Sequence, residues 1–205
     1  MSKYNVDNNI NEININSVLV EGENIIWSGQ PKKSAFILNK TLTMLPIALV
    51  WLSFDSFFIT SAFSSGDMLW FLIPFFALHL MPVWIWLSNV LTANKRWKNT
   101  KYIVTDKRLI IISGFIGIDY QSIYYKDIKN VRLRVNIIDK LLGVGDIYFD
   151  LQNPGNIAFL DVEDCYQIYP KIQKVILDIQ TDIEYPNNLR PESNDGYNTR
   201  YNSKF

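Results

Sequence analysis

The chain consists of a central apolar block between two polar ends. Residues 41–63 and 68–91 are almost continuously apolar, and only four residues, 64–67, separate them. As helices rising 1.5 Å per residue, these stretches would be about 34 to 36 Å long, enough to cross the hydrocarbon core of a bilayer. Buried helices of a water-soluble protein are the alternative, but such helices normally keep one polar face, which is missing here. The pattern therefore predicts a two-helix transmembrane hairpin over residues 41–91.

Flanking charges predict the orientation of this hairpin. The basic residues on its two sides are Lys32, Lys33 and Lys40 before the first stretch and Lys95, Arg96 and Lys98 after the second. The connecting loop carries only Asp67, so the positive-inside rule places both termini in the cytoplasm. Prolines at 46, 74 and 82 are expected to kink the helices without ending them, because membrane helices tolerate the lost backbone bond.

After Lys98 the pattern changes to short segments rich in Ile, Val, Tyr and Phe, which is typical of strands. The expected strands cover residues 101–105, 108–113, 118–125, 128–133, 146–151 and 157–160. A final helix is predicted over residues 162–180, with Glu163 and Asp164 in its first turn and an apolar stripe along one side. Residues 95–182 should therefore form a mainly-β or α+β domain in which this helix covers a small antiparallel sheet.

Composition narrows the possible functions. The net charge is zero, which argues against a dedicated nucleic-acid binder. Charge is nevertheless uneven, with 11 basic and 4 acidic residues in 95–140 but 2 basic and 8 acidic residues in 141–184. The one cysteine, Cys165, excludes an internal disulfide and a cysteine-based zinc cluster. Residues 1–20 and 185–205 are polar and lack an apolar period, so both ends are expected to be disordered, and residues 21–40 form a pre-membrane segment.

Two sets of residues resemble the bacterial pleckstrin-homology (PH)-like family, in particular its membrane-anchored two-span members. In the predicted domain they are Tyr102, Thr105, Asp106, Arg108, Gly114, Ile128, Val131, Gly143, Gly145, Asp146 and Ile147. Before the apolar block they are Glu23, Ile26, Trp27, Gly29 and Pro31. The resemblance implies two packed antiparallel sheets capped by a C-terminal helix, without enzymatic activity. It also implies a bacterial cell membrane location with a cytoplasmic domain that acts as a scaffolding or oligomerising module.

Two ionisable residues lie inside the apolar block. Asp55 and His79 are about 10 and 14 residues from the loop, which corresponds to a depth difference of about 4 to 5 Å. They can therefore meet across the helix interface. Because ionisable groups in a bilayer are costly, they are candidates for a proton relay or an ion site. The alternative is that they hydrogen-bond one another, a neighbouring protomer or interfacial water.

Basic residues after the second stretch are candidates for lipid contact. Lys95, Arg96, Lys98 and Lys101 would attract anionic head groups, or they are ordinary positive-inside flanks. The turn between the strands predicted at 101–105 and 108–113 offers only Lys107 and Arg108, which argues against a specific head-group site.

Other motifs favour structural roles. Thr105, Asp106 and Arg108 are expected to fix a hairpin through side-chain to backbone bonds. Residues 143–146, GVGD, lack the Lys-Ser/Thr of a phosphate loop and should form a turn. The acidic side chains at 146, 150, 161, 163 and 164 are expected to be surface charges.

The leading hypothesis is a membrane-anchored, non-enzymatic binding or assembly module that contacts membrane lipids and either a protein partner or further copies of itself. With one histidine in the apolar block and one cysteine near a helix start, no catalytic triad or dyad can be assembled. We expect no cofactor, metal, nucleic acid or small-molecule substrate. The alternatives are a small transport or proton-conducting component that uses Asp55 and His79, and an anionic-lipid-binding module.

Overall fold

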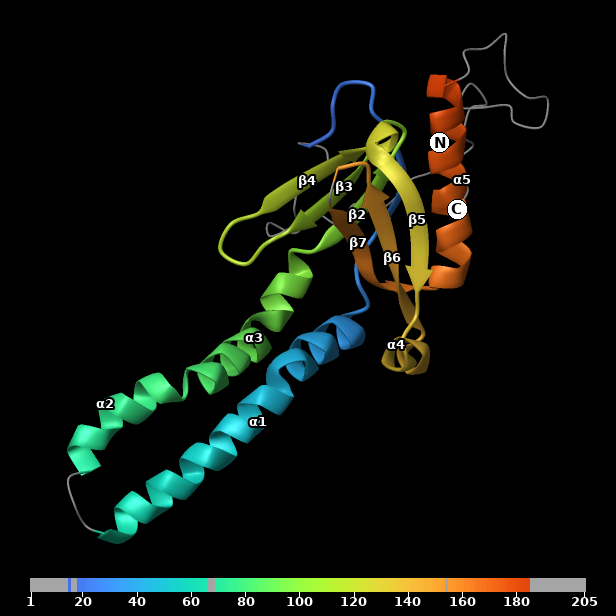
Figure 1. The fold of residues 1–205 in the computed structure, drawn as a ribbon. Helices are drawn as coiled ribbons and strands as arrows, with labels where there is room; N and C mark the ends of the chain where they lie inside the picture. The colour runs from blue at the N-terminus through green and yellow to red at the C-terminus, as the bar shows by residue number, and fades with distance from the viewer. Residues whose placement is uncertain (1–14, 16–17, 66–68, 154, 185–205) are drawn as a thin grey trace.

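The computed structural model describes residues 15, 18–65, 69–153 and 155–184. They form a long helical hairpin attached to a domain of two antiparallel sheets and one helix (Figure 1). The helices are α1 (Lys33–Ser65), α2 (Leu69–His79), α3 (Met81–Lys98), α4 (Ile137–Leu142) and α5 (Cys165–Glu184), with a short 3-10 turn, η2 (Tyr125–Asp127). The strands are β1 (Ile25–Gly29), β2 (Lys101–Thr105), β3 (Arg108–Ser113), β4 (Asp119–Tyr124), β5 (Ile128–Arg134), β6 (Val144–Leu151) and β7 (Asn156–Glu163).

In the hairpin, α1 packs along α3, and α2 continues α3 beyond a sharp break at Leu80. The described segments on either side of this break are bent by 59°. Pro82 lies in the first turn of α3 and has no N–H, so the backbone cannot continue the helical ladder through this point. Two indoles donate to the carbonyls beside the break: Trp51 Nε1 to His79 O at 2.8 Å and Trp84 Nε1 to Ala77 O at 2.9 Å.

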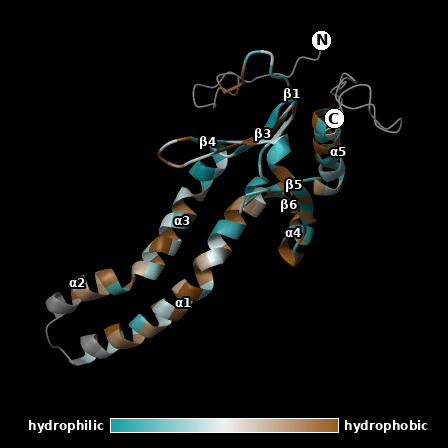
Figure 2. Ribbon diagram, turned by 45° about the horizontal axis from the view of Figure 1, so that its top comes forward, coloured by the Kyte–Doolittle hydropathy of each residue, from teal (hydrophilic) through white to brown (hydrophobic). Residues whose placement is uncertain are grey.

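Both arms of the hairpin extend beyond the predicted apolar stretches. One described helix, Lys33–Ser61, is long and apolar enough to cross a membrane, and the bent pair in the other arm meets the same test when it is counted as one span. Apolar residues recur along the coloured length of both arms (Figure 2). Since α1 begins at Lys33, the predicted pre-membrane segment 21–40 already contains its first two turns.

The hairpin is inserted between two neighbouring strands of one sheet. The order of the first sheet is β1-β2-β3-β4, and β1 pairs antiparallel with β2, with Gly29 opposite Tyr102 and Ile25 opposite Thr105. The strand predicted at 101–105 is therefore the second of the sheet, and the segment predicted at 21–40 contributes the first strand. The sequence gives no local sign of this pairing, because the partner of β1 lies more than 70 residues away.

The second sheet has the order β5-β6-β7, and α5 packs against β5, β6 and η2. The predicted arrangement of two antiparallel sheets with a C-terminal helix is confirmed. Two details differ from the prediction. Glu163 ends β7 and Asp164 has φ 50°, so α5 begins at Cys165 and both acidic residues precede it.

Helix α4 between β5 and β6 was not predicted. The Asn136 and Asp139 side chains each accept a bond from the other's backbone N–H, which forms a capping box at the start of α4. Gly143 ends the helix with φ 68°, a conformation that glycine adopts without strain. The GVGD prediction therefore holds for Gly143 alone, since Val144–Asp146 belong to β6.

The main core lies between the two sheets and α5. Its fully buried side chains include Leu109, Phe149, Phe159 and Ile172. The other face of the first sheet is also covered. Here Ile103, Ile110 and Ile112 form a second cluster with Ile15, Val18, Leu19 and Ile25. The prediction of disorder up to residue 20 therefore extends too far, while residues 1–14, 16–17 and 185–205 lie outside the described part of the chain.

Candidate functional site

The β2–β3 turn holds a buried ion pair. Arg108 Nε lies 3.0 Å from Glu23 Oε1, and the two side chains are 12% and 0% exposed. Burial raises the pKa of Glu23, but hydrogen bonds from Arg108, the Val20 N–H and Thr105 outweigh it and hold the pKa below its ordinary value. Thr105 Oγ1 also accepts from the backbone N–H groups of Lys107 and Arg108. These are side-chain to backbone bonds of the kind expected for this motif.

Asp106 completes the same turn from its exposed side. Its carboxylate accepts from the Asn24 N–H at 3.0 Å and from Asn24 Nδ2 at 2.9 Å. The turn thus fixes the segment that leads into β1. The contacts described above have a structural role, and they involve Glu23, Thr105, Asp106 and Arg108.

Trp27, Gly29 and Pro31 connect β1 to the root of the hairpin. The Trp27 ring stacks on Phe159 at 6.0 Å, and a Cβ at Gly29 would lie 2.5 Å from that ring, so only glycine leaves it room. The Pro31 carbonyl accepts from Trp97 Nε1 at 2.8 Å, which ties the start of α1 to the end of α3. Trp27 and Gly29 thus pack within the domain, and Pro31 links the two arms at their base.

Asp55 and His79 meet inside the hairpin. Their closest atoms, His79 Nδ1 and Asp55 Oδ1, are 2.8 Å apart, and Asp55 is 1% exposed. The His79 ring stacks on Phe75 at 5.2 Å and lies 5.6 Å from Trp51. Asp55 is therefore buried between the two arms, whereas the His79 side chain, flanked by aromatic rings, is 31% exposed.

The basic residues at the root of α3 are only partly brought together. Lys95 and Arg96 both lie over the Phe115 ring, at 5.0 and 5.2 Å from its centroid. Lys98 is exposed at the end of α3, and Lys101 begins β2. Lys95 and Arg96 thus form a pair beside the β3–β4 turn.

A buried acidic junction, not anticipated from the sequence, joins the domain to α1. Asp161 is 3% exposed; its N–H donates to Asp146 Oδ1 at 3.0 Å, and its Oδ1 accepts from Asn39 Nδ2 at 2.6 Å. Burial, together with repulsion from Asp146 and Asp139, raises the pKa of Asp161 to about 6. The prediction that Asp161 is a surface charge is wrong, because α1, α4 and β6 converge on it. Over the described ranges, no three His, Cys, Asp or Glu side chains are arranged to hold a metal ion.

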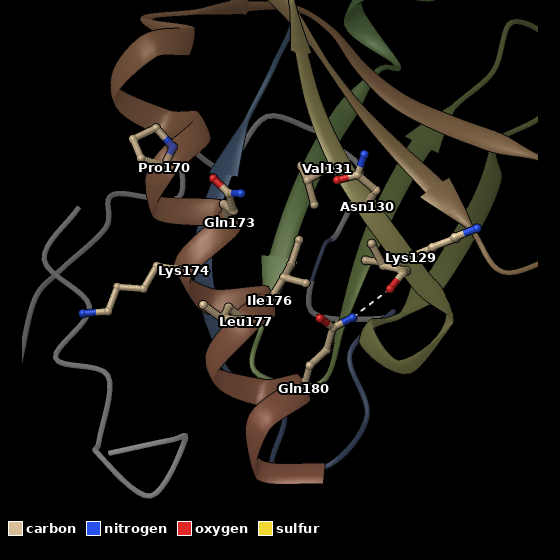
Figure 3. Close-up of a pocket in the computed structure, with 10 residues that line it drawn as sticks. Lys129, Asn130, Val131, Pro170, Gln173, Lys174, Ile176, Leu177 and Gln180 are labelled. Carbon is tan, nitrogen blue, oxygen red and sulfur yellow. Dashed lines mark hydrogen bonds between the residues drawn. The ribbon is translucent and has the colours of Figure 1, made fainter. Parts of the chain in front are cut away.

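A shallow groove of about 330 Å³ lies between β5 and α5 (Figure 3). Lys129 and Val131 line it from the strand, and Gln173 and Leu177 from the helix. At one end, Gln180 Nε2 donates to the carbonyls of Tyr125 and Ile128 at 2.9 and 2.8 Å. The groove therefore has fixed walls and a mixed apolar and basic lining.

Comparison with known proteins gives a family match and similar solved structures. A family model described as "Bacterial PH domain" matches residues 38–176, which cover most of α1, the rest of the hairpin and the domain as far as α5. Among solved structures, a crystal structure of a DUF1696 family protein with a pleckstrin-homology domain from Shewanella loihica PV-4 is similar, with a TM-score of 0.32 and 18% identity. That alignment covers 38% of this chain and 70% of the other. No curated protein matches the chain.

Proposed function

This chain belongs to the bacterial PH domain family, and we propose that it is a membrane-anchored, non-enzymatic binding or scaffolding module. The hairpin crosses the cell membrane twice, both termini and the domain are cytoplasmic, and the domain binds a protein partner or further copies of itself. A PH-like domain supports such a role because it presents a rigid surface to which a partner can bind, and binding needs no catalytic residues.

The observation that carries this proposal is the insertion of an outwardly apolar hairpin between β1 and β2. Its exposed side chains include Val50 at 67%, Phe57 at 68% and Leu78 at 73%. Apolar surface of this extent is unfavourable in water and favourable in lipid. Since both arms continue directly into paired strands, a bilayer that holds the hairpin also holds the domain.

Labelling of single cysteines in intact cells tests the anchoring. A membrane-impermeant maleimide should modify Ser64→Cys, at the far end of α1, without permeabilisation. It should modify Ile183→Cys, on α5, only after the membrane is opened. The opposite pattern would refute the orientation, and release of the protein by alkaline carbonate would refute the anchoring.

Cross-linking tests partner binding. A photo-reactive amino acid at Leu177, 57% exposed in the groove, is compared with one at Tyr166, 68% exposed on the same helix but outside the groove lining. A partner or second copy that uses the groove should be captured in cells from position 177 and not from 166. A lone monomer in mild detergent, combined with no capture from either position, would refute a binding or assembly role.

The Asp55–His79 contact favours a second candidate, a proton-conducting or transport component formed by several hairpins. Two helices cannot enclose a pathway, so this function needs an oligomer. The double variant Asp55→Asn with His79→Leu should abolish proton flux in proteoliposomes, whereas Ser56→Ala should not. Absence of flux in the unmodified protein, or unchanged flux in the double variant, would refute this candidate.

A further inference from the structure

Three large apolar side chains of the domain are almost fully exposed: Ile116 at 93%, Ile137 at 82% and Leu141 at 81%. Within the described part of the chain these are the highest exposed fractions of any large hydrophobic residue. They exceed those of the hairpin itself, where Leu78 and Leu91 reach 73%. These fractions also exceed those of the other exposed apolar side chains of the domain, such as Tyr166 at 68% and Ile183 at 60%, so the places where the three residues lie are candidates for an interface.

These residues belong to two tips, one beside each arm of the hairpin. The first tip is the β3–β4 turn, Gly114–Ile118, an apolar end of the domain on the hairpin side (Figure 2). Gly114 has φ 151°, and a Cβ there would lie 2.0 Å from a backbone oxygen across the turn, so the turn is tight. The Gly114 carbonyl accepts from Asn99 Nδ2 at 3.4 Å, which attaches the turn to the end of α3.

The second tip is α4, which stands beside the start of α1. Lys32 Nζ, just before α1, donates to the Leu142 carbonyl at 3.0 Å, and α4 contacts α1. The capping box formed by Asn136 and Asp139 fixes the helix start, so Ile137 and Leu141 are held outward by a defined structure. Both tips are therefore rigidly positioned at the place where the hairpin leaves the domain.

The charges around the tips indicate what covers them. Lys95 and Arg96 lie over the Phe115 ring at the first tip. In α4, Lys140 is exposed while the only carboxylate, Asp139, is fully buried. The exposed carboxylates nearby are Asp119, which follows the first tip, and Glu163, which pairs with Lys32 beside the second. Lys95, Arg96, Lys140 and Lys32 outnumber these two acids, and exposed apolar side chains with a cationic excess match the interface of an anionic bilayer.

We propose that both tips insert into the head-group region of the inner leaflet, so that the domain rests on anionic lipid on either side of the hairpin. This inference rests on the proposed function, because it requires the hairpin to be in the membrane. It adds a lipid-binding surface that includes Lys95 and Arg96 but is centred on apolar residues.

The full chain can be tested in vesicles of phosphatidylethanolamine and phosphatidylglycerol. An environment-sensitive fluorophore is attached in turn to Ile116→Cys, Leu141→Cys, Ile183→Cys and Phe57→Cys; native Cys165, 2% exposed, is shielded from the reagent. At positions 116 and 141 we expect a blue shift, loss of quenching by aqueous iodide, and quenching by lipids spin-labelled near the head group. Position 183, on α5, should remain open to iodide.

Position 57 separates the two possible failures. If the label at position 57 is protected from iodide while the labels at 116 and 141 are as accessible as the label at 183, the tip insertion is overturned. The anchored hairpin is left intact by that result. Iodide access at position 57 would overturn the membrane anchoring itself. If the labels at 116 and 141 are protected from iodide only at a high protein-to-lipid ratio, the tips contact a second copy of the chain instead of lipid. If the same labels are equally protected in phosphatidylcholine vesicles, the preference for anionic lipid is overturned.

Discussion

Replacing Asp161 by asparagine should stabilise the protein at neutral pH and change little near pH 4. The substitution keeps an oxygen that can accept from Asn39 Nδ2, and asparagine tolerates the φ of 54° found at this position. It removes the charge that burial and the neighbouring carboxylates, Asp146 and Asp139, make unfavourable. The contact between α1 and the domain is therefore preserved while its electrostatic cost is relieved.

The pKa shift sets the size and the pH window of the effect. The pKa of Asp161 rises from 3.8 to about 6 on folding, so the native state favours the protonated carboxyl. The associated stability is present below the unfolded pKa and is lost as the pH rises through the folded pKa. A shift of roughly two units corresponds to an upper bound of about 3 kcal/mol. Because the repulsion is shared with coupled carboxylates, we expect about 1.5 kcal/mol, or a rise in Tm of roughly 6 to 12 °C for the domain.

Thermal unfolding in mild detergent, followed by tryptophan fluorescence between pH 4 and 8, measures this difference. Asp119→Asn, which changes an exposed aspartate at the start of β4, is the matched control and should shift Tm little at any pH. The difference between Asp161→Asn and the parent protein should appear between pH 4 and 6 and remain constant above that range. A variant that is less stable at pH 7.5, or equally stabilised at pH 4, would refute the reasoning.

Substitutions at Arg108, Gly145 and Tyr125, with a control at Gly117, test the packing of the domain by urea unfolding in the same detergent. Arg108→Ala leaves the Glu23 carboxylate buried without its cation and should cost about 3 to 5 kcal/mol, whereas Arg108→Lys should restore part of that loss. Gly145→Ala places a Cβ 2.7 Å from the sulfur of the one cysteine and should cost about 1 to 3 kcal/mol. Gly117→Ala, which points into open space, should stay within about 0.5 kcal/mol of the parent; equal losses at both glycines would contradict the packing argument. Tyr125→Phe removes a buried hydroxyl that donates to a β2 carbonyl and should cost about 1 kcal/mol, so an unchanged unfolding midpoint would show that this bond contributes nothing.

Strands and helices that are marked by their own apolar pattern and turn residues are predictable from this sequence. The strands β2 and β3 match the predicted limits because continuous apolar runs flank the turn residues Asp106 and Lys107. Strand β1 escapes prediction because its five residues acquire strand character by pairing with β2, far along the chain. Helix α4 is only six residues long, too short for a visible apolar period, although the Asn136–Asp139 capping pattern and Gly143 do mark its two ends.

The candidate sites also divide into one that local sequence spacing predicts and one that depends on the tertiary structure. Counting residues from the hairpin loop places Asp55 and His79 at similar depths, and their side chains do meet. The acidic junction depends instead on three elements from distant parts of the chain and on a left-handed backbone at Asp161, none of which the local pattern reveals. Acidic residues in a polar strand end resemble solvated charges until the tertiary structure encloses them.

The insertion of the hairpin between β1 and β2 also affects the order of events during synthesis. Ile25 leaves the ribosome 80 residues before its partner Thr105. At about 5 to 20 residues per second, β1 waits roughly 4 to 16 s for the strand that completes its pairing. During that interval α1, α2 and α3 must be made and brought back on themselves, since only a closed hairpin returns the chain to the sheet. Completion of the first sheet therefore depends on formation of the hairpin, and a chain whose hairpin fails keeps an unpaired β1 and an exposed edge on β2.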